Sequence, residues 1–491
     1  MKIAHICHLS SSSGVSVLPS NLNKKLNDDV NFSSTFYHND FYKKKKNFVF
    51  LESSKILSKS IFDLYLKYKS EDVANFCFFY EGIYKEADLK LLNNYDVIHL
   101  HWINFFLNLD NLVDIFKSKP IVITVHDQHL LFGGCHWRNN CENYKIECNK
   151  CPQLNKKVNN IANYNFIKKK EIFDNSNITF VHQNENSLEI GKNIYKKNTH
   201  TLVDCSIDTE LFNIISNKSE LKKKYNFENN KKIILSLCGY NSYTKGSWQF
   251  DELEKQIDPS FLIILVGSGF DGIENKKNRI INLGHINDKK KINELYNISD
   301  VCFSLSREEG VPGIACESLS AGIPFIGFKD VGNLNRMILN GKNGFLIENF
   351  SIKEFAKKLE ENFLPNFLIR KDFLERFEYK FYKGYKNIYQ NLKFTQKNPN
   401  KINLDSVIYE NFKQIVDRQI ELNRKLELNI ISFLIYFVKN FNEGSKLILG
   451  YFLNKFRRNS FTLFLWRKIF NNKTRIVIKK YLKKKTYLII L

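Results

Sequence analysis

Two glutamates in the second half of this 491-residue chain have a spacing that suits the binding of a phosphorylated ligand. Glu309 lies in an acidic, Gly-rich loop, and Glu317 lies eight positions later in a segment that we expect to be a helix over residues 314–321. Free backbone N–H groups and the helix dipole favour phosphate at the start of such a helix. A carboxylate also accepts paired hydrogen bonds from adjacent hydroxyl groups. The pair therefore indicates a site for a sugar nucleotide.

The elements around the two glutamates make this pattern specific. We expect a strand over residues 301–305, a loop over 307–313, the helix, and a second strand over 324–328, followed by the turn N-G-K-N-G-F-L. In this order the chain resembles the retaining glycosyltransferases of family 4, which have the two-domain GT-B fold. The resemblance covers about residues 1–392. It implies an α/β protein with two Rossmann-like, doubly wound domains that face a cleft.

The resemblance also implies a donor site with positive charge for the diphosphate. An apolar strand over residues 232–238 ends at Gly239, and Lys245 keeps the place of the family's lysine. Tyr240 stands where the family has an arginine, so Arg307 or another cation could substitute for it. Positive charge is needed there because negative charge develops on the leaving diphosphate in the transition state.

The roles of the acidic motif follow from the same resemblance. Glu317 would hold the ribose hydroxyls of the donor, or else only cap its helix, and Glu309 would face the transferred sugar. Backbone amides near Gly313 would contact hydroxyl or phosphate groups. Further on, the family's G-G-x-x-E element ends here in Arg336 instead of an acid. That change affects local packing or substrate choice and leaves the main pair intact.

The first half of the chain offers two further candidates. Gly14 follows the first strand and precedes a helix, so backbone amides there could meet the donor phosphate or the acceptor. His126 ends an apolar strand over residues 121–125. In the family, the histidine at this strand end points into the cleft beside the transferred sugar, so His126 has the best claim of the chain's 11 histidines to a direct role.

A cysteine-rich loop over residues 133–154 resembles an insert of family members that make bacterial surface polysaccharide. Its cysteines have the spacing C-x5-C-x6-C-x2-C, and they are Cys135, Cys141, Cys148 and Cys151. Four thiolates could hold a structural zinc ion, or the loop could carry free thiols. Catalytic zinc is disfavoured because four thiolates leave no open position. The donor site has no D-x-D sequence, so we expect no metal cofactor in catalysis.

The order of apolar segments predicts four parts. An N-terminal acceptor domain spans residues 1–203, and a donor-binding domain spans 204–374. A helix over 375–394 then crosses back onto the first domain, where Tyr385 and Tyr389 are expected to pack. A basic, amphipathic helical extension covers 395–491.

The net charge of +23 is concentrated in that extension. Residues 395–491 hold 20 Lys and Arg against six Asp and Glu, and no acid follows Glu443. Such basic amphipathic segments bind anionic membrane surfaces. The longest apolar run, 430–438, is shorter than the roughly 18 residues of a membrane span. We therefore expect a cytoplasmic protein, peripheral at the inner face of the cytoplasmic membrane.

Together these features predict a retaining glycosyltransferase that uses a nucleotide-sugar donor and a lipid-linked saccharide acceptor in bacterial surface polysaccharide synthesis. Three alternatives remain open: another GT-B enzyme, such as a sugar-nucleotide epimerase or phosphorylase, a nucleic-acid-binding protein, and a non-catalytic scaffold. Only the charge favours nucleic acid, since no helix-turn-helix, zinc-finger or aromatic-basic motif is present.

Overall fold

The computed structural model describes the chain in segments. The described residues are 1–8, 14–38, 48–50, 64, 67, 76–77, 90–103, 113, 116–204, 207–227, 231–239, 243–276, 279–363, 366–395 and 410–425. Residues 1–412 form one compact unit, and residues 413–491 form a second, of which the helical residues 413–425 are described. Most of the predicted basic extension therefore lies outside the described residues.

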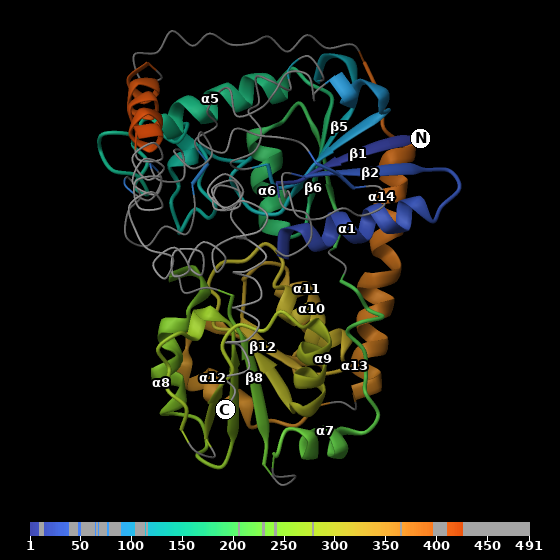
Figure 1. The fold of residues 1–491 in the computed structure, drawn as a ribbon, viewed down its shortest axis with the longest axis vertical. Helices are drawn as coiled ribbons and strands as arrows, with labels where there is room; N and C mark the ends of the chain where they lie inside the picture. Colours follow the sequence, from blue (N-terminus) through green and yellow to red (C-terminus); the bar gives the residue numbers. More distant parts are fainter. Residues whose placement is uncertain are drawn as a thin grey trace, which may run out of the picture. The chain divides into compact units, whose positions relative to one another are not determined.

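The first half of the large unit is built on a seven-stranded parallel sheet (Figure 1). Its order is β3-β2-β1-β4-β5-β6-β7, so the strand order reverses between β1 and β4. The strands are β1 Lys2–Ile6, β2 Ser33–His38, β3 Phe48–Phe50, β4 Val97–Leu100, β5 Ile121–Val125, β6 Ile178–His182 and β7 Thr199–Leu202. The helices of this half that the structure describes from end to end are α1 Gly14–Asn27, η1 Lys90–Asn94, η2 Asn143–Ile146, α5 Ile161–Asp174 and α6 Glu185–Ile194.

The second half carries a six-stranded parallel sheet in the order β10-β9-β8-β11-β12-β13. Its strands are β8 Ile233–Leu237, β9 Leu262–Val266, β10 Ile280–Asn282, β11 Val301–Phe303, β12 Phe325–Phe328 and β13 Gly344–Ile347. The longer helices are α7 Lys218–Lys224, α9 Lys289–Ile298, α10 Gly313–Ser320, α12 Ile352–Leu359, α13 Asn366–Phe373 and α14 Tyr379–Gln390. Shorter ones are η3 Tyr243–Lys245, η4 Ser247–Gln249, α8 Phe250–Glu254, η5 Ser268–Phe270, α11 Leu334–Met337, η6 Glu348–Phe350 and η7 Leu374–Glu378.

The central strands are mainly apolar because helices cover both faces of each sheet. All five residues of β5 and of β9 are buried. Each half has a hydrophobic core of its own. The two parallel sheets with flanking helices confirm the predicted two-domain α/β architecture.

Helix α14 follows the second half in the chain but packs on the core of the first. Phe381, Tyr385 and Tyr389 are fully buried among residues of β1, α1 and β4. Figure 1 shows α14 beside α1, and two ion pairs, Lys25–Glu378 and Lys386–Asp29, join these segments. The C-terminal helix thereby fastens the two halves to each other.

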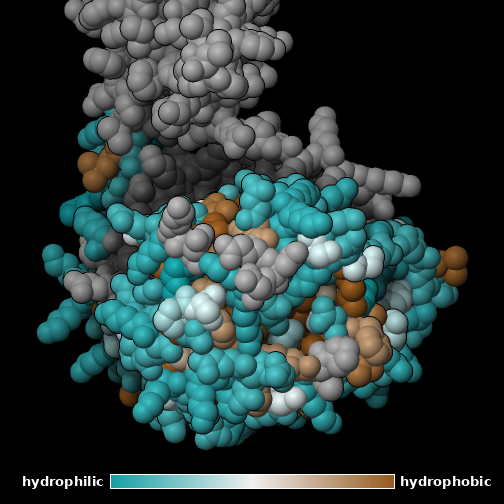
Figure 2. All heavy atoms as spheres, turned by 90° about the horizontal axis from the view of Figure 1, so that it is seen from below, coloured by the Kyte–Doolittle hydropathy of each residue, from teal (hydrophilic) through white to brown (hydrophobic). Residues whose placement is uncertain are grey.

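The surface seen in Figure 2 is mainly hydrophilic, with hydrophobic residues scattered among polar ones. Among the helices that the structure describes, none combines the length and apolarity needed to cross a bilayer.

Candidate functional site

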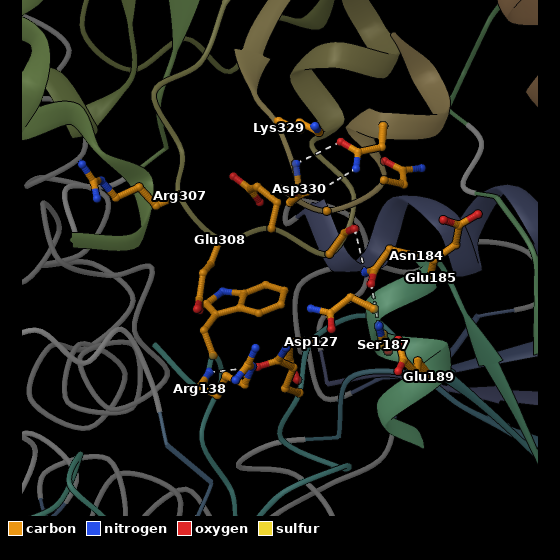
Figure 3. Close-up of a pocket in the computed structure, with 18 of the residues that line it drawn as sticks. Asp127, Arg138, Asn184, Glu185, Ser187, Glu189, Arg307, Glu308, Lys329 and Asp330 are labelled. Carbon is orange, nitrogen blue, oxygen red and sulfur yellow. Dashed lines mark hydrogen bonds between the residues drawn. The ribbon is translucent and has the colours of Figure 1, made fainter. Parts of the chain in front are cut away.

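A cleft of about 690 Å³ lies where strands from both sheets end (Figure 3). The first half lines it with residues that follow β5 and with the start of α6, and the second half lines it with loops that follow β11, β12 and β13. Ligands of parallel α/β proteins bind at this carboxyl edge of the strands. A volume of this size suits a small-molecule ligand.

Two of the predicted residues meet in this cleft from opposite halves. His126 follows β5, Glu309 lies in the loop after β11, and both line the cleft. The loop approaches the end of β5 so closely that a Cβ on Gly310 would lie 2.4 Å from the His126 carbonyl oxygen. Asn184 Nδ2 also donates to the Gly310 carbonyl oxygen at 3.1 Å. Only a glycine permits this contact between the two halves.

Lys245 is paired with the acidic loop. Its Nζ lies 2.6 Å from Glu309 Oε1, and both side chains are mostly shielded from solvent. Lys245 is not itself among the described residues that line the cleft. The arrangement places one positive charge directly behind the carboxylate at the cleft wall.

A chain of hydrogen-bonded histidines leads from His126 into the core. His126 Nε2 lies 3.1 Å from His101 Nδ1, and His101 Nε2 lies 3.0 Å from His5 Nδ1. Burial lowers the pKa of His126 to about 4 and the pKa of His5 to about 3, so the rings are neutral at pH 7. This row of histidines could not be predicted from the sequence, because its members are far apart along the polypeptide and lie in or directly after three different strands.

Arg307 lines the cleft but is held by aromatic rings. Its guanidinium lies 5.7 Å from the ring centre of Tyr243, 5.2 Å from that of Trp248 and 4.5 Å from that of Phe350. Nε also donates to Gln249 Oε1 at 3.1 Å. These cation–π contacts fix the position of the charge while leaving it positive.

Glu317 lies on α10 and is not among the described residues that line the cleft. Its Oε2 accepts a hydrogen bond from the Tyr296 hydroxyl at 2.9 Å. Burial raises the pKa of Glu317 to about 7. Gly313 begins the same helix, is exposed, and has space around it where a side chain would lie.

The other two glycines of the prediction lie at the start of a helix and just after a strand. Gly14 is the first residue of α1, and Gly239 is exposed just after β8 with open space around its Cα. Neither lines the cleft within the described part of the chain. Tyr240, which replaces the family's arginine, lies outside the described residues.

All four cysteines of the insert line one cavity of about 20 Å³. Cys148 Sγ accepts a hydrogen bond from the Gly133 N–H at 3.3 Å, and Cys141 Sγ accepts one from the Asn143 N–H at 3.4 Å. Burial raises the pKa of Cys148 to about 11 and that of Cys151 to about 12. No three of these sulfur atoms lie within 4.8 Å of one another.

Among the described residues, one set of three potential ligand atoms is that close, and it belongs to the buried residues His5, His99 and His101. Their nitrogens are largely occupied by hydrogen bonds. His99 bonds to Tyr389 Oη at 2.7 Å and to Thr124 Oγ1 at 2.8 Å. The set is therefore a hydrogen-bonded network within the core.

Two further residues line the cleft that the motifs of the sequence did not indicate. Glu308 is partly buried, desolvation raises its pKa to about 7, and the backbone N–H groups of Asn139 and Asn140 donate hydrogen bonds to it. Asn333 is 1% exposed, and both polar atoms of its side chain have no partner among the described residues. Unsatisfied buried amides are rare and often mark a ligand contact. The substitution of glycine by Asn333 in the G-G-x-x-E element was the one available signal.

Arg336, the other substitution in that element, forms ion pairs with the first half. Its Nη2 lies 3.0 Å from Asp204 Oδ2 and its Nε lies 3.1 Å from Asp204 Oδ1, while Nη1 lies 3.2 Å from Glu185 Oε1. A cation thus takes the place of the family's acid and bridges the two sides of the cleft.

Residues 217–372 match the family of glycosyl transferases group 1. This region runs from just before α7 to α13, so it covers the second sheet and the acidic motif.

Two relatives match parts of the chain. One is an Escherichia coli (strain K12) protein that is provisionally named as the colanic acid biosynthesis glycosyl transferase WcaC. The two sequences are 22% identical over 276 residues, which are 51% of this chain and 63% of that protein. The other is the N-acetyl-alpha-D-glucosaminyl L-malate synthase of Bacillus anthracis, 24% identical over 168 residues, 30% of this chain and 43% of that protein. The matches thus span less than two thirds of either relative.

Among solved structures, the crystal structure of Anabaena Alr3699/HepE in complex with UDP has a TM-score of 0.54 and 13% identity. It covers 80% of this chain and 100% of that one. At this identity the likeness concerns the fold, and it confirms the GT-B fold expected from the sequence.

Proposed function

We propose that this protein is a retaining glycosyltransferase that moves a sugar from a nucleoside-diphosphate donor to a glycan acceptor in bacterial surface polysaccharide synthesis. The observation that carries the proposal is the meeting of His126 and the Lys245–Glu309 pair, from opposite halves, at the edge where the strands end. The group 1 match over the second half and the likeness to WcaC support the reaction class and the biological setting. The bound UDP of HepE supports a nucleotide donor.

The proposed chemistry needs alignment and charge more than a nucleophile. The bond from the anomeric carbon to the diphosphate breaks, and the acceptor oxygen bonds to that carbon on the same face. The departing phosphate oxygen takes the acceptor proton. Lys245 stabilises the negative charge on the leaving group, so the transfer step requires no metal ion in this proposal. Glu309 and His126 align the sugar through its hydroxyl groups.

Because His126 is neutral, only some chemical roles are open to its side chain. With a pKa of about 4, the ring neither carries charge nor serves as a strong base at pH 7. It can accept or donate one hydrogen bond to a sugar hydroxyl, while Nε2 stays bonded to His101. We therefore assign it a positioning contact to the transferred sugar.

The nucleotide would lie over the second half. Glu317 would accept hydrogen bonds from the ribose, and the open surroundings of Gly239 and Gly313 would allow phosphate to approach the backbone. Gly14 would provide a backbone amide from the first half, and Arg307 would provide positive charge at the cleft wall.

The test starts with a screen of nucleoside-diphosphate sugars for protection of the protein against heat. Nucleotide release from the stabilising donor is then measured with and without a polyprenyl-linked saccharide, and NMR of the product gives the anomeric configuration. Release should require the acceptor, with retention. Lys245→Ala should lower kcat by a factor of about 100, whereas Lys276→Ala, which breaks a surface ion pair with Glu254, serves as the control.

The alternatives predict other outcomes. An epimerase would interconvert donor sugars without an acceptor, and a phosphorylase would depend on phosphate. A scaffold would bind a donor without turnover. Salt-sensitive binding of DNA or RNA, with no donor binding, would favour the nucleic-acid reading.

We further propose that the acceptor is lipid-linked and that the basic extension holds the enzyme at the inner face of the cytoplasmic membrane. Thirteen Lys and Arg, and no acid, follow Glu443. Each such charge near an anionic surface contributes about 1 kcal/mol. The whole protein should float with anionic liposomes and detach in high salt, and a chain truncated after residue 400 should stay at the bottom of the gradient. Equal flotation of both proteins would contradict the anchoring role.

A further inference from the structure

The cysteine-rich insert, residues 133–154, faces two cavities at once. On one side its four cysteines line the small cavity described above. On the other side Trp137, Arg138 and Asn140 line the large cleft. The insert contains η2 as its one helix, and no strand. The wall of the cleft is therefore a loop with little regular structure to hold it.

The backbone of the insert is strained and needs a constraint. Five non-glycine residues have positive φ: Asn139 (47°), Asn140 (63°), Glu147 (59°), Cys148 (58°) and Lys150 (50°). Such conformations each cost on the order of 1 kcal/mol and persist only where the surroundings enforce them. Four of these five residues lie between two of the cysteines, and the fifth is Cys148 itself. A link among the four sulfur atoms would therefore restrain the backbone at all five positions.

Hydrogen-bond donors and one buried cation lie close to the sulfur atoms, and they would stabilise thiolates that bind a metal ion. Backbone N–H groups donate to Cys141 and Cys148, and those of Gln153 and Leu154 bond to Cys151. Lys169 on α5 is fully buried, bonds to the His129 carbonyl oxygen at 2.5 Å, and interacts electrostatically with Cys135 and Cys148. A zinc ion with four thiolates has a net charge of −2. A buried ammonium group beside the sulfurs offsets part of that charge.

We propose that Cys135, Cys141, Cys148 and Cys151 bind one Zn²⁺ ion and that this ion holds residues 136–140 against the loop after β11. In a tetrahedral site with Zn–S distances of about 2.3 Å, the sulfurs are about 3.8 Å apart. Binding therefore draws the four sulfurs closer together within the cavity that they already share. Rotation about the Cα–Cβ bonds moves the sulfurs without displacing the backbone. Four sulfur ligands make the ion structural, since they leave no position for substrate.

Residues 136–140, which lie between the first two cysteines, connect the insert to the cleft. The Asn139 and Asn140 N–H groups bond to Glu308, and a Cβ on Gly310 would lie 3.4 Å from the Trp137 ring. Glu308 and Gly310 flank Glu309 in the chain. Fixing the insert thus fixes the loop that carries the proposed sugar contact. This second part of the proposal rests on the proposed function, whereas zinc binding does not.

The first test is the metal content of the full chain, purified with a reductant and without chelators or an affinity tag that binds metal. Elemental analysis should give about one zinc per chain. Cys148→Ser and Cys151→Ser should each lose it, while Cys77→Ser, a buried cysteine beside the insert that does not line the cavity, should retain it. A protein with one iron instead, or with no metal and four reactive thiols, would overturn the proposal.

A second measurement needs no cysteine variant, so its result does not depend on whether such variants fold. An organomercurial added to the unmodified protein should release one zinc, detected with a metal-sensitive dye, as about four thiols react. Release should make the insert sensitive to protease and raise the donor KM about tenfold, with a smaller change in kcat. Zinc release with an unchanged KM and an intact insert would refute the positioning role while leaving the metal site in place.

Discussion

At the scale of single residues, the environment of Glu317 sets two demands against each other. The side chain packs against α9, where Tyr296 donates to it, and burial raises its pKa to about 7. The folded state therefore binds the proton more tightly than the unfolded chain, in which the pKa is near 4.5. Ionisation destabilises the fold as pH rises between these two values, and this effect is absent at low pH. Ribose binding, in contrast, needs the ionised form.

The variant Glu317→Gln separates these demands. It keeps the acceptor for Tyr296 and cannot ionise, so it should unfold at a temperature higher than the parent's by about 3 °C at pH 8, and at the same temperature at pH 4. Its donor affinity should fall by about tenfold or more, because a charged hydrogen bond contributes about 1.5–3 kcal/mol. Thermal scans with and without donor across this pH range measure both effects. A variant that is less stable than the parent at pH 8 would contradict the effect of ionisation on the fold, and a variant that keeps full donor affinity would contradict the ribose contact.

The sequence indicated some of the residues that line the cleft, but it did not indicate the hydrogen bonds that hold them in place. The family motif led to Glu309 and His126, and both line the cleft. It could not lead to His5 or His101, because the hydrogen bonds join residues that lie 96 and 25 positions apart. The sequence marks Asn333 only by the glycine that it replaces in the G-G-x-x-E element, because an unpaired side-chain amide can be recognised only in the folded structure.

At the scale of elements, helix α14 is fastened by polar contacts as well as by packing. Tyr389 and Tyr385 were expected to be packing residues, and both are fully buried. Their hydroxyl groups also bond to His99 and Thr124, at 2.7 Å and 2.9 Å. These bonds tie the end of the second half to β4 and β5, next to the histidine chain.

Removing one hydroxyl should therefore loosen the helix. Tyr389→Phe leaves a buried His99 nitrogen without its partner, which costs about 1–3 kcal/mol. The midpoint of thermal unfolding should fall by several degrees, on the order of 5 °C. Tyr379→Phe is the matched control, because Tyr379 is on the same helix and 66% exposed. Equal midpoints for the two variants would mean that packing alone holds α14.

The strands show which elements a sequence can reveal. Several strands can be recognised in the sequence as apolar runs, because both of their faces are buried. They are β1, β4, β5, β6, β8, β9 and β12. In contrast, β7 (Thr199–Leu202) lies at the edge of its sheet and has no buried residue. An edge strand of this kind needs no apolar run, and it was not predicted.

At the scale of the whole molecule, Arg336 joins the two sides of the cleft. Two bonds to Asp204 form a bidentate pair, and a third contact reaches Glu185 on α6. The sequence showed that an acid had been replaced but could not show the partners, which lie 132 and 151 positions away. Because the donor and the acceptor would be held by different halves, the strength of this pair affects how long the cleft stays closed.

The variant Arg336→Ala tests that role. A partly exposed pair contributes about 1 kcal/mol, so its loss should shift the balance toward the open form by roughly fivefold. The radius of gyration in X-ray scattering should increase, and the donor KM should rise by a similar factor. Salt should raise the KM of the parent and have less effect on the variant, since screening weakens the same pair. Lys276→Ala breaks an ion pair within the second half and should change neither quantity. If Arg336→Ala keeps the parent's radius and salt dependence, closure must depend instead on the contact between Gly310 and the end of β5, which no salt would weaken.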